Sequence, residues 1–511
     1  ATGAHLTPLV QLGFVIDHTR CIGCHACTVA CKSENHVPVG NFRTWVKYTE
    51  GGTFPSVRRG FSVLRCNQCT GAPCVEICPV TALSKHENGI VDVDPNACIG
   101  CKSCTHACPY DAIYINEESG IAEKCHFCEH RIERGLAPAC AVVCPTEAII
   151  PGDFNDPESR VSQLRSNGGL TVRKPEARTG PNVHYIGVNS AGITPGETNL
   201  SQGFIWSVPP SGERAVAQSY EAEHGQETAR TTYDVPRSQI WGWRVSTYLW
   251  TKSIAAGVLP VAFLAQAMGA DAVPSEADFT RFIAAAVALV FLGITGLLLI
   301  ADLKRPERVL YIFRRPNWDS WLVRGSFIIL GYSAVLVACL FVGSWLLEWG
   351  AYILGGWTAA YTAYLFGQAK GRVLWMRPGL AIHLVIQAGI AGASVLALMD
   401  TLGVALDSSL LASLPKILTV CLGGHLLAIL LEGRMVPKGR EEEYARAARL
   451  LSHGPYARMH WGVGVALGIL LPLAILAGSS PLLPVAAILA LGGLLVEEDL
   501  FVRAGQALPI S

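Results

Sequence analysis

The chain has 511 residues, of which 50% are hydrophobic and only 16% are charged. Soluble proteins carry nearer to 25% charged residues, so this composition excludes an ordinary soluble enzyme and places much of the chain in lipid. Lys and Arg total 40, as do Asp and Glu, so no net positive charge attracts nucleic acid and we expect no such partner.

Cysteine is concentrated near the start of the chain. Of the 18 cysteines, 16 lie between Cys21 and Cys144, in a segment that the apolar tail does not share. Four motifs contain all sixteen: Cys21-x2-Cys24-x2-Cys27-x3-Cys31, Cys66-x2-Cys69-x4-Cys74-x3-Cys78, Cys98-x2-Cys101-x2-Cys104-x3-Cys108 and Cys125-x2-Cys128-x11-Cys140-x3-Cys144.

This spacing is typical of iron–sulfur ligation. Three cysteines in a tight loop can surround one face of a [4Fe–4S] cluster, while the fourth points toward a different cluster. The motifs must then exchange their last cysteines in pairs, which predicts four [4Fe–4S] clusters and leaves the pairing open. Zinc needs no third cysteine two residues on, and cysteines so close in sequence cannot all meet disulfide geometry, so both alternatives are disfavoured. Lys32 follows the first motif where the others have Pro, which removes no ligand.

These motifs carry a resemblance over residues 13–155. The head looks like the four-cluster ferredoxin subunits of molybdopterin oxidoreductases, such as dimethyl sulfoxide reductase, polysulfide reductase and respiratory formate dehydrogenase. In that family the first motif pairs with the fourth and the second with the third, an arrangement that we call the nested pairing. It implies four ligand sets here: Cys21, Cys24, Cys27 and Cys144; Cys125, Cys128, Cys140 and Cys31; Cys66, Cys69, Cys74 and Cys108; Cys98, Cys101, Cys104 and Cys78.

Five basic residues between the first two motifs are predicted to lie on the surface. They form either a solvated face or a docking face for a partner subunit, and they are Arg43, Lys47, Arg58, Arg59 and Arg65. The connector that follows the head, residues 156–240, is rich in Gly, Ser, Pro, Asn and Arg, with a strand-like piece at 182–188. We expect it to wrap the head or to lie on the membrane surface.

Eight apolar runs follow from about Trp241, and a span needs about 20 such residues. The fourth and eighth runs are short; the eight lie near 245–267, 279–301, 325–347, 352–368, 379–399, 414–432, 459–477 and 482–496. We therefore expect a multidomain protein. It would have an α+β ferredoxin-like head of two pseudo-symmetric two-cluster units (1–155), the connector (156–240) and an all-α bundle of eight transmembrane helices (241–511).

The loop charges predict the orientation in an inner (cytoplasmic) membrane. Loops on the side of the head carry fifteen basic residues, whereas the opposite loops are short and acidic, with Asp271, Glu276, Asp278, Asp400 and Asp407. By the positive-inside rule the head faces the cytoplasm. The fifteen are Lys304, Arg305, Arg308, Arg314, Arg315, Arg324, Lys370, Arg372, Arg377, Arg434, Lys438, Arg440, Arg446, Arg449 and Arg458.

The first apolar run also carries ionisable groups. Arg244, Tyr248 and Lys252 recur every four residues and share one helix face. Such groups are costly in a membrane and normally face a functional cavity, and a quinone needs donors for two carbonyls and a proton route. Trp241 and Trp243 either line that cavity or anchor the helix at the membrane interface. Lys252 likewise either faces the cavity or extends its ammonium to the interface.

Two segments of the tail, 241–257 and 359–375, resemble the eight-helix quinol-interacting subunit of polysulfide reductase and its NrfD-like relatives. The resemblance implies a quinone site beneath the head, lined by Tyr361 and Thr362, and no haem. In that family head and tail are usually separate chains, whereas here they are fused.

Two further groups of residues leave alternatives open. Three carboxylates at the head-side ends of helices, Asp302, Glu432 and Glu498, could pass protons or simply be solvated. His383, His425 and His460 lie in or beside three spans and are either hydrogen-bonded interior histidines or, where two face one another, haem ligands.

We interpret the chain as the electron-transfer and membrane-anchor subunit of a respiratory oxidoreductase. It would pass electrons between a catalytic subunit holding a molybdenum or tungsten pterin and quinone or quinol in the lipid membrane. The alternative is a redox-coupled ion-translocating or haem-linked membrane module that serves a non-molybdenum partner.

Overall fold

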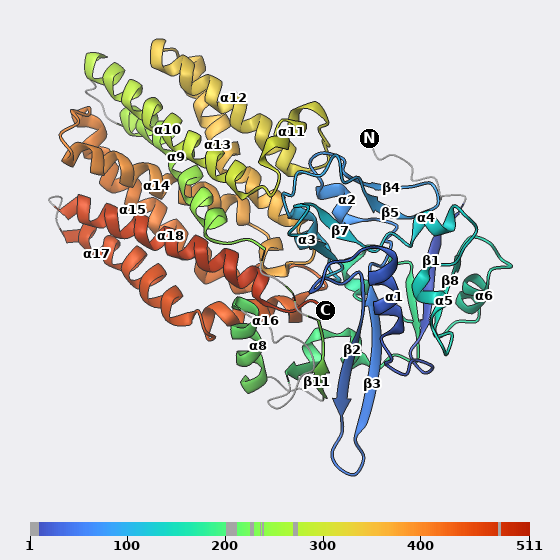
Figure 1. The fold of residues 1–511 in the computed structure, drawn as a ribbon. Coiled ribbons are helices and arrows are strands. Elements are labelled where there is room, and N and C mark those ends of the chain that lie inside the picture. The colour runs from blue at the N-terminus through green and yellow to red at the C-terminus, as the bar shows by residue number, and fades with distance from the viewer. Residues whose placement is uncertain are drawn as a thin grey trace.

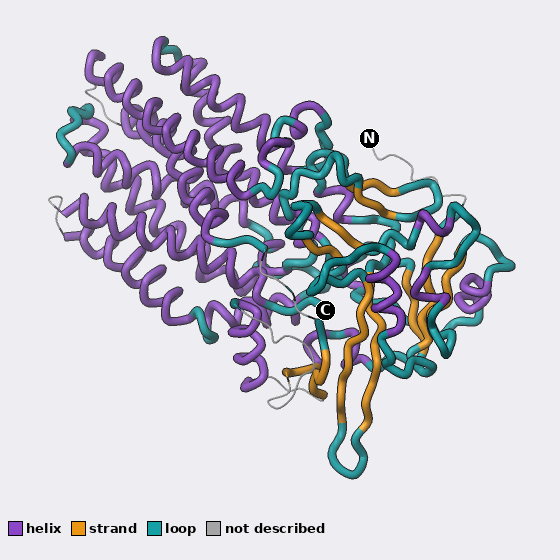
Figure 2. The backbone as a smooth tube through the Cα atoms, viewed as in Figure 1, coloured by secondary structure: helices purple, strands orange, loops and turns teal. Residues whose placement is uncertain are grey.

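The computed structural model describes residues 10–200, 212–224, 229–235, 237, 240–268, 274–478 and 482–511. Part of the connector and Asp271, one of the acidic loop residues, lie outside these described residues. A head of short strands and helices comes first in the chain, and a bundle of long helices packs end-on against it (Figure 1). Figure 2 shows that the strands are confined to the head and its connector.

A three-stranded sheet lies in the head. Its central strand β1 (Leu12–Asp17) pairs antiparallel with β8 (Ile149–Asp153) and parallel with β9 (Val183–Ile186). The strand-like piece expected at 182–188 is thus confirmed, and it brings the connector into the sheet of the head. Phe14, Val15 and Ile16 are completely buried, which anchors the first residues of the head.

Short helices and hairpins hold the cysteine motifs. The last cysteine of the first motif lies in α1 (Ala26–Glu34), and those of the others lie just after α2 (Pro73–Ile77), α3 (Ser103–Ala107) and α5 (Ala139–Val142). The hairpins are β4 (Leu83–Lys85) with β5 (Val91–Val93), and β6 (Ile113–Ile115) with β7 (Ala122–Lys124). The remaining helices of the head are α4 (Glu129–Ile132) and α6 (Arg160–Ser166).

A longer hairpin of β2 (Thr44–Gly51) and β3 (Arg58–Arg65) projects from the head (Figure 1). The connector extends it, because β11 (Ala229–Tyr233) pairs with β2 and β10 (Thr198–Leu200) pairs with β11. The other connector elements are η1 (Pro175–Ala177), α7 (Ser190–Ile193), η2 (Pro195–Glu197) and α8 (Glu213–His224), the last of which contacts the bundle.

Within the described residues, the bundle contains six helical segments that are long and apolar enough to cross a membrane: Trp243–Met268, Asp278–Asp302, Trp321–Phe341, Leu380–Thr401, Ser408–Arg434 and Met459–Gly478. They correspond to α9 (Trp243–Met268), α10 (Pro274–Asp302), α12 (Trp321–Phe341), α14 (Leu380–Thr401), α15 (Ser408–Leu431) with η5 (Glu432–Arg434), and the π-helix η6 (Met459–Leu470) with α17 (Leu471–Gly478). Two more long helices, α13 (Trp345–Gln368) and α18 (Leu483–Ala507), run beside them but are not among these six segments. Short helices on the head side are η3 (Pro306–Arg308), α11 (Tyr311–Arg314), η4 (Val373–Met376) and α16 (Glu441–Ser452).

Helix α9 is the centre of the bundle and contacts α10, α13, α14, α15 and α18. Its approach to α14 is close because two glycines face each other. A methyl group at Gly257 would lie 1.8 Å from the Ala388 carbonyl oxygen, and one at Gly392 would lie 2.4 Å from the Gly257 carbonyl carbon. Small residues of this kind let helix backbones approach within a membrane.

The loop between α10 and α12, residues 303–320, joins the bundle to the head. The Arg308 guanidinium donates to the Cys98 carbonyl oxygen at 2.8 Å, and the Asn317 amide donates to the Cys78 carbonyl oxygen at 2.8 Å. Lys102 and Asp302 form an ion pair across the same junction, also at 2.8 Å. We call residues 303–320 the clasp, because they hold the third motif and the end of the second from one side.

Candidate functional site

The cysteine thiols gather between motifs as well as within them. Burial raises the pKa of the Cys21 thiol, and the neighbouring thiols of Cys144 and Cys24 raise it further. For Cys31, burial is again the main cause of a raised pKa, followed by the thiols of the fourth motif. Two groups result: the far group of Cys21, Cys24, Cys27 and Cys144, and the second group of Cys125, Cys128, Cys140 and Cys31.

The other two motifs exchange their last cysteines in the same manner. Burial, with help from the Cys66 thiol, raises the pKa of Cys108 to about 11, and burial together with Cys78 raises that of Cys101 to about 12. The third group is therefore Cys66, Cys69, Cys74 and Cys108, and the near group is Cys98, Cys101, Cys104 and Cys78. These neighbours are the ones expected if the first motif pairs with the fourth and the second with the third, and the ligand sets themselves stay a prediction.

The four groups lie in a row. Thiols of different groups lie close together at three places, because Cys140 raises the pKa of Cys27, Cys125 raises that of Cys66, and Cys74 raises that of Cys104. The row therefore runs from the far group through the second and third groups to the near group. The near group lies next to the bundle, because the clasp contacts its loops.

Two buried cations lie between neighbouring groups. Arg65 is 0% exposed; its Nη1 donates to the Cys140 Sγ at 3.2 Å, whereas its Nε and Nη2 are buried without a partner in the described chain. Lys124 is also buried and lies beside the thiols of Cys66 and Cys74. Buried thiols ionise only beside positive charge, which iron would supply, and orphaned N–H donors suit the sulfides of a cluster. The cysteines and their surroundings thus fit iron–sulfur clusters.

Arg65 and Lys47 correct a prediction made from the sequence. Both were expected on a basic surface, but both are buried, and only Arg58 and Arg59 lie exposed near the hairpin tip. The reason is that the base of the hairpin is covered on both faces by the head and the connector. Arg43 is paired with Glu123 at 3.0 Å.

A cavity of about 260 Å³ lies where the near group meets the bundle. Its wall is largely apolar and includes Leu299 and Leu330, and it carries a few polar groups: Cys101 and Ser103 from the head, and Tyr248, Asp302 and Tyr361 from the bundle. An apolar cavity with a small number of placed polar groups is the usual form of a small-molecule site.

The structure brings together most, but not all, of the residues singled out for a quinone. Trp241, Tyr248 and Tyr361 line the cavity. Lys252 and Thr362 lie behind it, with the Lys252 ammonium donating to the Thr362 hydroxyl at 2.7 Å. Arg244 does not line the cavity, because its side chain is exposed and donates to the Ala301 carbonyl oxygen at 2.9 Å.

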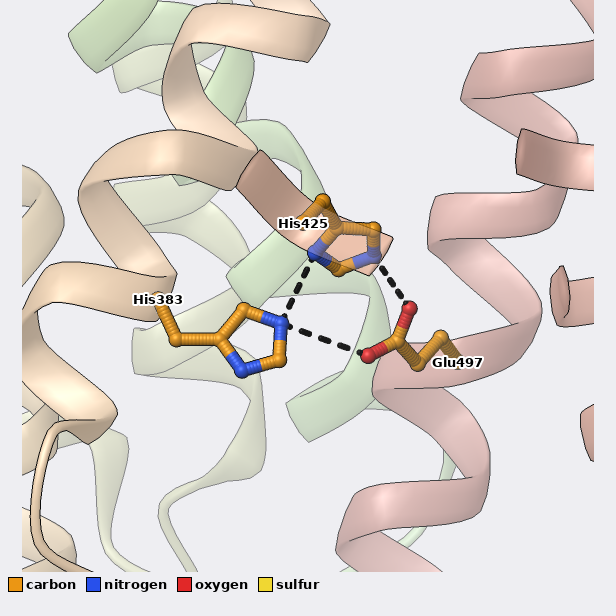
Figure 3. Close-up of side chains that lie close together, drawn as sticks. All are labelled: His383, His425 and Glu497. Atoms are coloured by element: carbon orange, nitrogen blue, oxygen red, sulfur yellow. Dashed lines mark hydrogen bonds and ion pairs between the residues drawn. The ribbon is translucent and has the colours of Figure 1, made fainter. Parts of the chain in front are cut away.

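A second polar cluster lies inside the bundle (Figure 3). His383 Nε2 is 2.8 Å from His425 Nδ1, and His425 Nε2 is 2.6 Å from a Glu497 carboxylate oxygen. On the other side of the His383 ring, Arg377 Nη2 lies 2.5 Å from Nδ1. The direct contact between the two imidazoles leaves no room for a porphyrin between them. Glu497 is not among the residues predicted from the sequence, although its acidic run with Glu498 and Asp499 follows an apolar segment and could have drawn attention to it.

The fold and these sites define a class: a membrane protein with an iron–sulfur head. Residues 57–154 match the family model of the 4Fe-4S dicluster domain, and residues 232–509 match that of Polysulphide reductase, NrfD. Because the second match covers more than half of the chain, the protein belongs to the NrfD family. It is a fusion of a ferredoxin-type electron-transfer head with an NrfD-type membrane anchor.

Curated relatives match little more than a third of this chain. A tetrathionate reductase subunit of Salmonella typhimurium is 44% identical over 195 residues, which are 37% of this chain and 77% of that protein. A polysulfide reductase chain of Wolinella succinogenes is 37% identical over 36% of this chain and 97% of its own length. The arsenate respiratory reductase iron-sulfur subunit ArrB of a Shewanella species is 36% identical over 35% of this chain and 96% of its own length.

Proposed function

We propose that the protein transfers electrons between a catalytic partner subunit and the quinone pool of the membrane. The far, second, third and near groups would each hold one [4Fe–4S] cluster, with all sixteen cysteines as ligands. When bound, such clusters supply one-electron transfer at potentials tuned by their surroundings. The protein's own contribution is to fix the row, to exclude water from most of the thiols and to place Arg65 and Lys124 between neighbouring groups.

The observation that carries this proposal is that Cys101 lies in the wall of the cavity. A quinone is an apolar ring with two carbonyl oxygens, and the cavity offers it apolar walls and two tyrosine hydroxyls as donors. A molecule in this cavity would lie against the near group, so electrons would have only a short distance to cross. Tyr248 and Tyr361 would orient the ring, with Trp241 as a wall, and Lys252 and Thr362 would support Tyr361 from behind.

The opposite end of the row is suited to a protein partner. Cys24 is exposed, and the exposed apolar side chains Ile22, Val29 and Val142 flank the far group. The names of the relatives identify them as subunits of reductases. We propose that a catalytic subunit with a molybdenum or tungsten pterin docks at this end, as in the families that the cysteine motifs resemble.

For the membrane arrangement we propose eight spans, with α13 and α18 as the two that complete the bundle. Their length and their position beside the six apolar helices support this. We further propose that the division into head (1–155), connector (156–240) and anchor (241–511) holds, and that the head faces the cytoplasm at the inner membrane. The basic loops support that orientation, although Lys304, Arg305 and Arg308 also bind the head directly.

The quinone half of the proposal is tested by mixing quinol with the full chain, purified without oxygen and with its clusters intact. We expect quinol to bleach the cluster absorption, and Tyr361→Phe to slow this on the order of tenfold through loss of one hydrogen bond. Tyr364→Phe, on the same helix but stacked on Trp321 at its surface, is the matched control and should react normally. Intact clusters that quinol cannot reduce would refute the quinone site.

The partner half is tested by affinity purification in mild detergent followed by metal analysis. We expect roughly sixteen iron atoms per chain, and molybdenum or tungsten in a co-purifying larger subunit. Iron without either metal, together with a different redox partner, would refute the pterin assignment and leave the cluster assignment intact.

A further inference from the structure

Three carboxylates at head-side helix ends are candidates for proton transfer, and two of them are engaged by cations. Asp302 accepts from Lys102 at 2.8 Å, and Glu432 is in direct contact with the Arg377 guanidinium. Glu498 differs, because it is only 3% exposed and accepts a single hydrogen bond, from the Ser253 hydroxyl at 3.3 Å. Its second oxygen has no partner in the described part of the chain.

Glu497, the neighbour of Glu498, is held by a hydrogen-bond chain of fixed direction (Figure 3). Arginine only donates, so Arg377 requires the Nδ1 of His383 to accept. The Nε2–H of His383 then donates to His425, whose Nε2–H donates to the Glu497 carboxylate. Both imidazoles are thereby neutral, and the positive end of the chain is Arg377. Because His383 Nε2 carries its proton, it is not free to bind a metal ion, and Glu497 is stabilised as a permanent anion.

Lys252 is the buried cation that interacts with Glu498. Its ammonium is fully buried and, among the residues that the structure describes, uses two of its three donors, on the Ala359 carbonyl oxygen at 2.9 Å and on Thr362. Lys252 and Glu498 attract each other electrostatically without forming a direct ion pair. One remaining donor on Lys252 and one unpartnered oxygen on Glu498 are what a single bridging water would join.

The same lysine reaches the cavity through Tyr361. Its Nζ lies 5.4 Å from the centre of the Tyr361 ring, and Tyr361 lines the cavity. Tyr248, one helical turn before Lys252, lines it as well and is within electrostatic reach of both Tyr361 and Glu498. Glu498 is thus linked to the cavity through Lys252 and Tyr361. Glu497 is linked instead to Arg377, through the hydrogen bonds of the two histidines.

We propose that Glu498 and Lys252 form the proton-exchanging pair of the cavity, while Glu497 keeps its charge throughout. This inference rests on the proposed quinone function. Oxidation of one quinol breaks two O–H bonds and releases two electrons and two protons. The electrons leave one at a time toward the near group. Each proton passes by Tyr361 and Lys252 to the Glu498 carboxylate, and then to the partly exposed Asp499 and water before the next one arrives; quinone reduction reverses these steps.

The test is time-resolved infrared difference spectroscopy on the full chain in membranes, recorded while quinol reduces the clusters so that a carboxylate protonated only in passing is seen. Protonation of a carboxylate creates a C=O band that shifts in heavy water. We expect this band in the wild type and in Glu497→Gln, and its loss in Glu498→Gln. Retention of the band in Glu498→Gln, or its loss only in Glu497→Gln, would overturn the assignment.

Two further measurements separate the possible failures. Titration of the same samples with a quinol analogue reports binding without turnover, and we expect Glu498→Gln to bind within about twofold of the wild type. Wild type that does not bind would refute the quinone function itself. Binding without the expected band pattern would refute only the proton assignment. Lys252→Met should slow reduction by quinol at least about tenfold, and an unchanged rate would overturn the role of Lys252.

Discussion

At the scale of single residues, the head places full positive charges where no solvent reaches. Arg65 has its guanidinium between the far and second groups and over the Phe14 ring at 4.3 Å, with Cys140 as its one hydrogen-bond partner among the described residues. Leaving such a group unpaired in a protein interior is costly. The cost is offset if the anionic clusters and their thiolates surround it, which makes Arg65 a determinant of their potential as well as of stability.

We predict that Arg65→Met lowers the reduction potential of the adjacent cluster by roughly 100 mV, because a fixed positive charge favours the more negative, reduced state. Arg65→Lys keeps the charge and should shift the potential much less. A redox titration followed by electron paramagnetic resonance measures both. Equal shifts in the two variants would show that packing, and not charge, sets the potential.

Residues that bind a cluster can be predicted from their spacing in the sequence. Residues whose role depends on where the fold places them are much harder to predict. Cysteine spacing predicts which thiols belong to one motif, because a [4Fe–4S] cluster needs several closely spaced thiolates as ligands. Nothing local distinguishes Arg65 from the exposed Arg58 and Arg59 on the same strand. The same holds for Glu497, whose importance depends on histidines more than 70 residues away.

At the scale of elements, the close approach of α9 and α14 fixes the bundle around the cavity. The contact depends on Gly257 and Gly392, and it sets the height of Lys252, which lies five residues before Gly257 on α9. A side chain there would collide with backbone atoms, which cannot move aside as a flexible side chain could.

We predict that Gly257→Ala destabilises the protein by at least about 1 to 3 kcal/mol, because its methyl group would lie 1.8 Å from a carbonyl oxygen. Gly293→Ala, on exposed α10 with nothing within 4 Å, is the matched control and should be neutral or slightly stabilising. Thermal unfolding in detergent compares the two. A Gly257→Ala protein as stable as the control would mean that the helices can separate without loss.

Apolar runs in the sequence coincide with all eight long helices of the bundle, although α13 and α18 are not among the six apolar enough to count as spans. Helix α13 has Tyr361 and Thr362 within its apolar run, and Glu497 and Glu498 of α18 follow directly after its run. Strand pairing of the connector is harder to predict. Residues 182–188 look like a strand, but their pairing with β1 depends on the folded head.

At the scale of the whole molecule, the clasp determines how the head is placed on the membrane domain. It contacts the carbonyls of Cys98 and Cys78, which belong to different motifs but to the same near group. The wall of the cavity is made from both sides of this junction, so its shape depends on the clasp.

We predict that Arg308→Ala weakens this junction by about 1 to 3 kcal/mol, because two carbonyls, those of Pro95 and Cys98, lose a charged donor. Hydrogen exchange should rise at residues 95–101 and in the clasp, and reduction by quinol should slow. Arg314→Ala, an exposed residue of the same loop, is the control. Unchanged exchange in Arg308→Ala would show that other contacts hold the head in place.

The connector has a consequence that concerns assembly. The tetrathionate and polysulfide reductase relatives match 37% and 36% of this chain, whereas here one polypeptide joins head and anchor and adds strands to the head on the way. A tether of this kind replaces a bimolecular association with an intramolecular one at a high effective concentration. The junction therefore need not supply the free energy that keeps two separate subunits together at cellular dilution. Polar contacts such as those of the clasp can therefore be selected only for aligning the head with the membrane domain. In addition, synthesis as one chain fixes one redox head for each membrane site.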